Sequence, residues 1–103
     1  MTAQAAAMLR EAADLVSGDR NATYGDAYEQ HMKAAFIFNG WLKAKYGGLP
    51  DLDAADMCEA LIAVKKSRPL QTGVPHRDTD VDCVAYQALR AYCDERKRAQ
   101  NEK

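Results

Sequence analysis

Apolar residues recur at spacings of three and four through most of the chain, the period expected of amphipathic helices. The pattern predicts four helices, and strand-like alternation persists nowhere along the sequence. The first helix begins after Thr2, a residue suited to cap it, and ends at Ser17-Gly18. Its apolar stripe consists of Ala5, Met8, Leu9, Ala12 and Val16.

The second helix is expected to begin at Asp26, because Glu29 follows three positions later as in a capping box. Gly47-Gly48 and Pro50 stop this helix. Its apolar stripe consists of Ala34, Ala35, Phe38, Trp41 and Leu42.

Asp53 is suited to cap the third helix, whose buried side we expect to include Leu61, Ile62 and Val64. This helix should end before Pro69, and residues 69–77 should form the longest loop. The fourth helix is predicted to begin near Asp78. Its apolar repeat is Val81, Ala85, Ala88, Leu89 and Tyr92. Residues 95–103 are charged without an apolar face, and we expect them to fray.

Four helices in one chain of 103 residues indicate an all-α, four-helix bundle-like single domain over residues 1–103. A chain of this size buries only roughly 60–65% of its unfolded surface by itself. We therefore expect the protein to form a homo-oligomer.

The composition excludes several classes of protein. The net charge is −1 with 28% charged residues, which argues against general nucleic-acid binding. No apolar run approaches the roughly 20 residues that cross a bilayer. The three cysteines show no CxxC spacing, so we interpret them as reduced core residues of a cytoplasmic protein.

Two polar motifs stand out, SGDRNATYGDAYE at residues 17–29 and HRDTDVDCVAY at residues 76–86. Each places acids, a base and a tyrosine at a helix boundary. In the first motif, Arg20 and Tyr24 form either a polar loop over a site or a self-contained turn. His31 is either a proton carrier or, as is more common for a lone helical histidine, a surface or packed residue.

Two carboxylate pairs could supply a metal site. Asp56 and Glu59 share one face of the third helix, and Asp78 and Asp82 share one face of the fourth. Pairs on adjacent helices offer the oxygen ligands that Mg²⁺ prefers. Phosphate oxygens of a nucleotide could then be held by the cations Arg20, Lys65, Arg68 and Arg77.

Acids near helix N-termini also stabilise helices in any protein, so a structural role is an equal alternative for these residues. Asp82 is the strongest candidate, because an acid beside the apolar residues Val81 and Ala85 needs a cation or metal. Tyr86, one turn further, either bonds to Asp82, stacks on a base or simply packs in the helix.

The motif order resembles a family of short phage and prophage proteins, from Leu9 to Tyr92. The residues that carry this resemblance are Gly18, Asp19, Arg20, Tyr24, Gly25, Asp26, Glu29, Asp56, Lys65, Arg68, Asp78, Asp82 and Tyr86. That family is in turn distantly similar to the MazG-type all-α nucleoside triphosphate pyrophosphatases, whose pattern is an ExxE pair followed by an ExxD pair. The nearest equivalents here are Asp56/Glu59 and Asp78/Asp82, and the second pair departs from that spacing.

The resemblance implies a Mg²⁺-dependent (d)NTP pyrophosphohydrolase. Asp56, Glu59, Asp78 and Asp82 would hold the metal, and Asp78 and Asp82 would be catalytic. Two alternatives remain open. One is a non-catalytic helical protein that binds a nucleotide or a host protein. The other is an oligomeric module whose motifs only cap helices.

Overall fold

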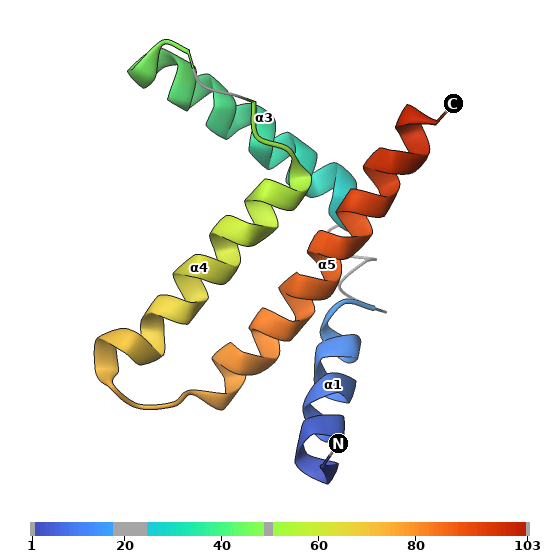
Figure 1. Cartoon of the computed structure of the whole chain (residues 1–103), viewed down its shortest axis with the longest axis vertical. Coiled ribbons are helices and arrows are strands. Elements are labelled where there is room, and N and C mark those ends of the chain that lie inside the picture. Colours follow the sequence, from blue (N-terminus) through green and yellow to red (C-terminus); the bar gives the residue numbers. More distant parts are fainter. Residues whose placement is uncertain (1, 18–24, 49–50, 103) are drawn as a thin grey trace.

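The structure is a computed structural model that describes residues 2–17, 25–48 and 51–102. These residues form four helices and no strand: α1 (Ala3–Leu15), α3 (Ala27–Tyr46), α4 (Ala54–Thr72) and α5 (Arg77–Asn101). Figure 1 shows α4 and α5 side by side as an antiparallel hairpin, with α1 along the other side of α5. The prediction of an all-α chain with four helices is confirmed for these residues.

Local chemistry starts and ends the helices largely where the sequence predicts. The side chains of Thr2, Asp26 and Asp53 accept hydrogen bonds from backbone N–H groups in the first turns of α1, α3 and α4. Asp53 forms a full capping box with Asp56. Gly47 caps the C-terminal end of α3 with a positive φ of 84°, as its position predicted. The predicted terminator Gly18 lies outside the described residues.

The end of α4 differs from the prediction. The helix continues through Pro69 to Thr72, and the connection to α5 is only residues 73–76. Proline lacks one N–H donor, yet Gly73 N donates to the Pro69 carbonyl oxygen (2.8 Å) and closes the last turn. Gly73 has φ 73° and ends the helix as a left-handed cap.

The boundaries of α5 also differ from the prediction. His76, rather than Asp78, is the N-cap, and its Nδ1 accepts a hydrogen bond from Thr79 N (3.3 Å). α5 continues to Asn101, so residues 95–101, which the sequence predicts to fray, are helical in this structure. Tertiary contacts explain the extension: Lys97 pairs with Asp53 (2.8 Å), and Tyr28 donates to Gln100 (2.9 Å).

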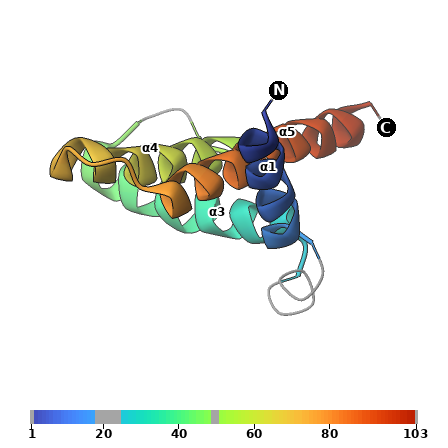
Figure 2. The same cartoon turned by 90° about the horizontal axis from the view of Figure 1, so that it is seen from below.

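Small side chains dominate the contacts between helices. The core of the hairpin contains Ala54, Ala55, Cys58 and Cys93, with Tyr28 from α3 packed against them. A second cluster joins α1 to α5 through Ala12, Val81 and Ala85. We call this contact between α1 and α5 the seam. Figure 2 shows α3 lying across one face of the hairpin.

Several residues expected in the core are exposed. Leu9, Phe38, Trp41 and Val64 retain 45, 36, 51 and 58% of their accessible surface. The physical reason for Phe38 and Trp41 is visible in Figure 1, because the C-terminal half of α3 projects beyond the hairpin. Periodicity identifies an apolar face but does not show that another helix of the same chain covers it.

Cys58 and Cys93 are buried and unoxidised, as expected of core cysteines, and Cys83 is half-buried. Burial, with the neighbouring Cys93 second, raises the pKa of the Cys58 thiol to about 12. Within the described residues, no helix is long and apolar enough to span a bilayer.

Candidate functional site

The predicted carboxylate pairs lie at different levels of the hairpin. Ion pairs mark these levels in order from the α4 N-terminus: Asp53 with Lys97, Glu59 with Arg90, and Lys65 with Asp82. Asp82 therefore faces α4 at Lys65, nine residues beyond Asp56. At 1.5 Å per residue the offset is about 14 Å along the helix axis. In this structure, Asp56 and Glu59 are therefore not grouped with Asp78 and Asp82 around one point, as the sequence predicted for a shared metal ion.

Asp56 and Glu59 instead have local structural partners. Asp53 N donates to Asp56 Oδ2 (2.9 Å), and Asp56 N donates to Asp53 Oδ1 (3.0 Å). Glu59 Oε1 lies 3.1 Å from Arg90 Nε. Capping and ion pairing account for both acids without a ligand.

A different set of acids shares one pocket. An open pocket of about 450 Å³ lies on the seam, and we call it the acidic pocket. Its lining residues are Glu11, Asp14 and Leu15 from α1 and Asp78, Val81 and Asp82 from α5. Four carboxylates from two helices thus surround the same space. No three His, Cys, Asp or Glu side chains of the described residues come together closely enough to hold a metal by themselves.

Asp82 connects this pocket to the hairpin. Lys65 Nζ lies 3.0 Å from Asp82 Oδ2, and the two side chains are only 18 and 33% exposed. The same ammonium group lies 5.7 Å from the centre of the Tyr86 ring. The two contacts hold Lys65 between Asp82 and Tyr86, and they fix the orientation of the Asp82 carboxylate.

Tyr86 in turn meets His31 edge to face, with ring centres 6.3 Å apart. His31 is buried, and its Nδ1 donates to the Ala27 carbonyl oxygen (2.7 Å). The packed, hydrogen-bonded interpretation of His31 therefore agrees with its place in the structure. These contacts connect three helices next to Asp82: His31 belongs to α3, Tyr86 to α5 and Lys65 to α4.

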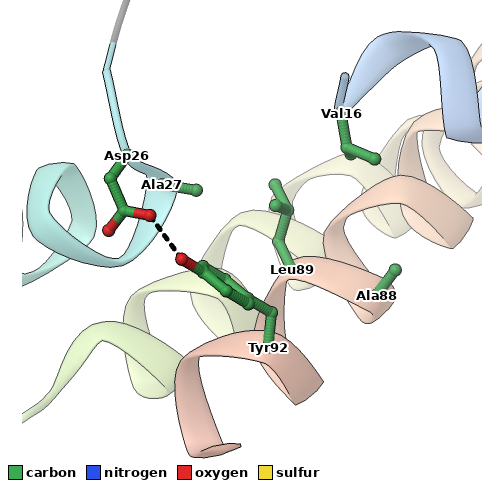
Figure 3. A pocket seen from close by; sticks show the side chains of 6 residues that line it. All are labelled: Val16, Asp26, Ala27, Ala88, Leu89 and Tyr92. Carbon is green, nitrogen blue, oxygen red and sulfur yellow. Dashed lines mark hydrogen bonds between the residues drawn. The ribbon is translucent and has the colours of Figure 1, made fainter. Parts of the chain in front are cut away.

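A second pocket, of about 320 Å³, lies further along α5, and we call it the tyrosine pocket (Figure 3). It is lined by Val16, Asp26, Ala27, Ala88, Leu89 and Tyr92. Figure 3 shows the Tyr92 hydroxyl pointing at the Asp26 carboxylate, to which it donates a hydrogen bond. The wall is thus apolar on the α5 side and polar at the start of α3.

Arg96 contacts the two polar groups of the tyrosine pocket, Tyr92 and Asp26. Arg96 Nη1 donates to the Tyr92 hydroxyl (2.7 Å) and to Asp26 Oδ1 (3.3 Å). The hydrogen bond from Tyr92, above all, lowers the pKa of Asp26. The same bond, with burial second, raises the pKa of Tyr92. Asp26 is therefore a held carboxylate that both caps α3 and anchors it to α5.

The remaining predicted ligand-binding residues are dispersed. Arg77 pairs with Glu11 across the seam, beside the acidic pocket. Arg68 is exposed near the end of α4. Arg20 and Tyr24 lie outside the described residues. Sequence reasoning missed Glu11 and Asp14, whose i, i+3 spacing on an amphipathic helix was a readable signal, and it missed Tyr92 and Arg96 as polar partners.

These features define an all-α protein with two neighbouring pockets, one acidic and one aromatic, along a central helix. The chain belongs to the family described as "Domain of unknown function (DUF6378)", whose model matches residues 7–94. It is similar to the Gene 55 protein of Mycobacterium phage D29, with 34% identity over 79 residues. That match covers 77% of this chain and 48% of the relative, so the chain spans about half of that protein's length. No solved structure matches the chain.

The resemblance to a phage protein family is therefore confirmed at the level of family.

Proposed function

We propose that this protein is a Mg²⁺-dependent hydrolase that releases pyrophosphate from nucleoside triphosphates, and that the acidic pocket takes the phosphates. The observation that supports this most is that Glu11, Asp14, Asp78 and Asp82, from two helices, line one pocket. The resemblance of the motifs to MazG-type enzymes supports the same reaction. The proposal keeps Asp78 and Asp82 as the central acids and replaces Asp56 and Glu59 with Glu11 and Asp14.

The donor chemistry of the acidic pocket fits Mg²⁺, which prefers carboxylate oxygens. Mg²⁺ is often held by one or two carboxylates, with waters and substrate phosphates completing its coordination. A pocket that supplies part of a coordination shell suits a metal that arrives with a triphosphate. Asp78 or Asp82 would hold it from α5, with Glu11 or Asp14 contributing from α1 and substrate phosphates and waters completing the shell.

When bound, the metal neutralises triphosphate charge and lowers the pKa of an attacking water. Side chains of the protein would supply the remaining groups that bind phosphate and accept a proton. Lys65 and Arg77 border the pocket and can move from Asp82 and Glu11 to phosphate oxygens, a favourable exchange of charge-assisted hydrogen bonds. Asp78 or Asp82 accepts the proton of the water, whose oxygen becomes part of the monophosphate as pyrophosphate leaves.

The tyrosine pocket is suited to the nucleoside end of the same substrate. Asp82 and Leu89 are seven residues apart on α5, about 10 Å along the helix. Leu89 and the Tyr92 ring offer an apolar surface for a base, and Asp26 offers an acceptor. The proposal therefore places the phosphates between α1 and α5 and the base where α5 meets the start of α3.

A paired substitution tests the proposal. The purified chain is incubated with each (d)NTP and Mg²⁺, and monophosphate and pyrophosphate are quantified. Asp82→Asn should lower kcat/KM by at least about 100-fold, the scale of a lost catalytic or metal-binding group. Asp80→Asn is the matched control, because Asp80 is an exposed acid of the same first turns that does not line the pocket.

Two results would overturn the proposal. One is the absence of product from all eight common nucleoside and deoxynucleoside triphosphates with a folded protein. The other is an equal loss in the Asp80→Asn and Asp82→Asn variants, which would show that the acidic pocket is not the site.

A non-catalytic nucleotide- or protein-binding role is the second candidate. The observation that favours it is that Asp82 and Glu11 already have cationic partners, Lys65 and Arg77. Such a protein should bind its ligand equally well in EDTA, whereas the hydrolase should lose binding when the metal is removed.

A further inference from the structure

The helix α3 carries apolar residues on two sides. One side packs against the chain's own hairpin through Met32, and Ala35 on the same side is buried. The other side faces solvent, and we call it the outer face of α3: Phe36, Ile37, Gly40, Trp41 and Ala44. Phe36, Ile37 and Trp41 retain 81, 73 and 51% of their accessible surface. Contiguous exposed apolar side chains of this kind mark a surface that binds a partner.

The chain exposes more surface than a compact monomer of its size. The accessible surface is 7381 Å², whereas a folded monomer of 11.4 kDa exposes about 5,800 Å². The radius of gyration is 15.6 Å, against about 13 Å for a compact chain of 103 residues. The excess of about 1,600 Å² per chain leaves room for a dimer interface of up to about 3,200 Å² in total, within the range of obligate homodimers.

Gly40 provides an independent observation. Gly40 lies in the middle of α3, where glycine is a poor helix former. No contact within the described residues requires a glycine at this position. A Cβ built at Gly40 meets nothing within 4 Å. Close approach of another helix is a common reason for such a glycine, and Phe36, Ile37 and Trp41 surround it on the helix surface.

We infer that the outer face of α3 is the interface of a homodimer, in which α3 of a second copy packs across Gly40. A second copy fits this face because a self-complementary apolar stripe needs no other chemistry in its partner, and because the excess accessible surface is of the size that a stable dimer buries. Each α3 then lies between its own hairpin and the partner's α3. This inference does not depend on the proposed hydrolase activity.

Sedimentation equilibrium of the full chain at micromolar concentrations tests the inference. The wild type should be a dimer, and Phe36→Glu should weaken association by at least about 100-fold, as expected for charge placed at a central apolar contact. Leu70→Glu is the matched control, because Leu70 of α4 is as exposed as Phe36 (84 against 81%) and lies outside the outer face. Leu70→Glu should remain dimeric.

The Gly40→Gln variant distinguishes a dimer interface from a helix face that is merely exposed. In an isolated chain glutamine has open space and a better helix propensity, so it should raise thermal stability. In the dimer its side chain blocks the approach of the partner, and association should weaken at least about tenfold. Circular dichroism verifies that each variant is helical. A monomeric wild type, dissociation by Leu70→Glu, or an unchanged dimer of Gly40→Gln would each overturn the inference.

Discussion

Acidic side chains occur both on the α4/α5 hairpin and along the seam between α1 and α5, and their surroundings differ. On the hairpin, Asp53 and Glu59 each meet a cation across the helix contact. Asp82 belongs to both regions, since it pairs with Lys65 of α4 and lines the acidic pocket. Along the seam, Arg77 with Glu11 is the one ion pair that crosses between α1 and α5 in the described residues, while Asp14 and Asp78 line the same pocket. Asp53 and Glu59 of the hairpin are therefore accounted for by ion pairs, whereas the acids of the seam gather at one pocket.

The hairpin also has more extensive apolar contacts than the seam. The hairpin buries Ile62 together with the Cys58 and Cys93 cluster, and α3 packs against it as well. The seam has a small core of Ala12, Val81 and Ala85. We expect the hairpin to carry the global stability and the seam to open locally, since local stability follows buried apolar contact.

The largest expected effect tests this difference in packing. Ile62→Ala should lower the free energy of unfolding by about 3 kcal/mol, because it leaves a cavity in the hairpin core. Val81→Ala should instead speed amide hydrogen exchange mainly in α1, with a smaller global loss. Denaturant unfolding and hydrogen exchange of α1 peptides measure the two effects. Equal acceleration of exchange in α1 and α4 by Val81→Ala would show that the regions unfold as one unit.

The second prediction concerns the residue that links the regions. Lys65→Met should lower the free energy of unfolding by about 1–2 kcal/mol, because the half-buried Asp82 carboxylate loses its partner. If Mg²⁺ occupies the acidic pocket, the freed carboxylate should bind it more tightly. Added Mg²⁺ should therefore raise the melting temperature of Lys65→Met more than that of the wild type.

Arg90→Met is the control for this measurement, since it frees Glu59 on the hairpin, away from the acidic pocket. A Mg²⁺ response of equal size in Arg90→Met and Lys65→Met would mean that any unpaired acid gives the effect.

The starts of the helices were predictable because they depend on residues a few positions apart. Asp26 and Asp53 cap the helices that follow them, and the bonds span only three residues. The end of α4 was not predictable in this way. Pro69 usually ends a helix, but here Gly73 and the short connection to α5 determine where the helix stops.

The site was less predictable than the fold. Asp82 was identified because its apolar neighbours imply a partner, and the structure supplies Lys65. Asp82 and Glu11 line the same pocket because of the way α1 packs along α5, and no local sequence pattern encodes that packing. The exposed Phe38 and Trp41 show the same limit, since periodicity does not distinguish an internal contact from an intermolecular one.

The third prediction addresses the bond that ties α3 to α5. Tyr92→Phe should cost about 1 kcal/mol at neutral pH, since Asp26 loses a hydrogen-bond donor. The folded-state pKa of Asp26 is lowered from 3.8, so this stability is present above that value and is lost as pH falls through the lowered pKa. The folded-state pKa of Tyr92 is raised from 10.0, so the stability is lost again as pH rises through the raised pKa.

Unfolding free energies of wild type and Tyr92→Phe across pH provide the measurement. The difference should be flat near neutrality and should shrink at both extremes. A difference that stayed constant in acid would show that Asp26 is not the acceptor that matters.

The smallest expected effect bears most directly on the comparison between hairpin and seam. Asp56→Ala removes one bond of the capping box and a negative charge from the N-terminus of α4, so it should cost about 0.5–1 kcal/mol. Because Asp56 lies about 14 Å along the helix axis from the level of Asp82, neither Mg²⁺ affinity nor nucleotide turnover should change. Calorimetric titration with Mg²⁺, run in parallel on Asp14→Asn, checks this. If Asp56→Ala weakened metal binding as much as Asp14→Asn, the acids of the hairpin would belong to the site after all, and the contrast between the two regions would be lost.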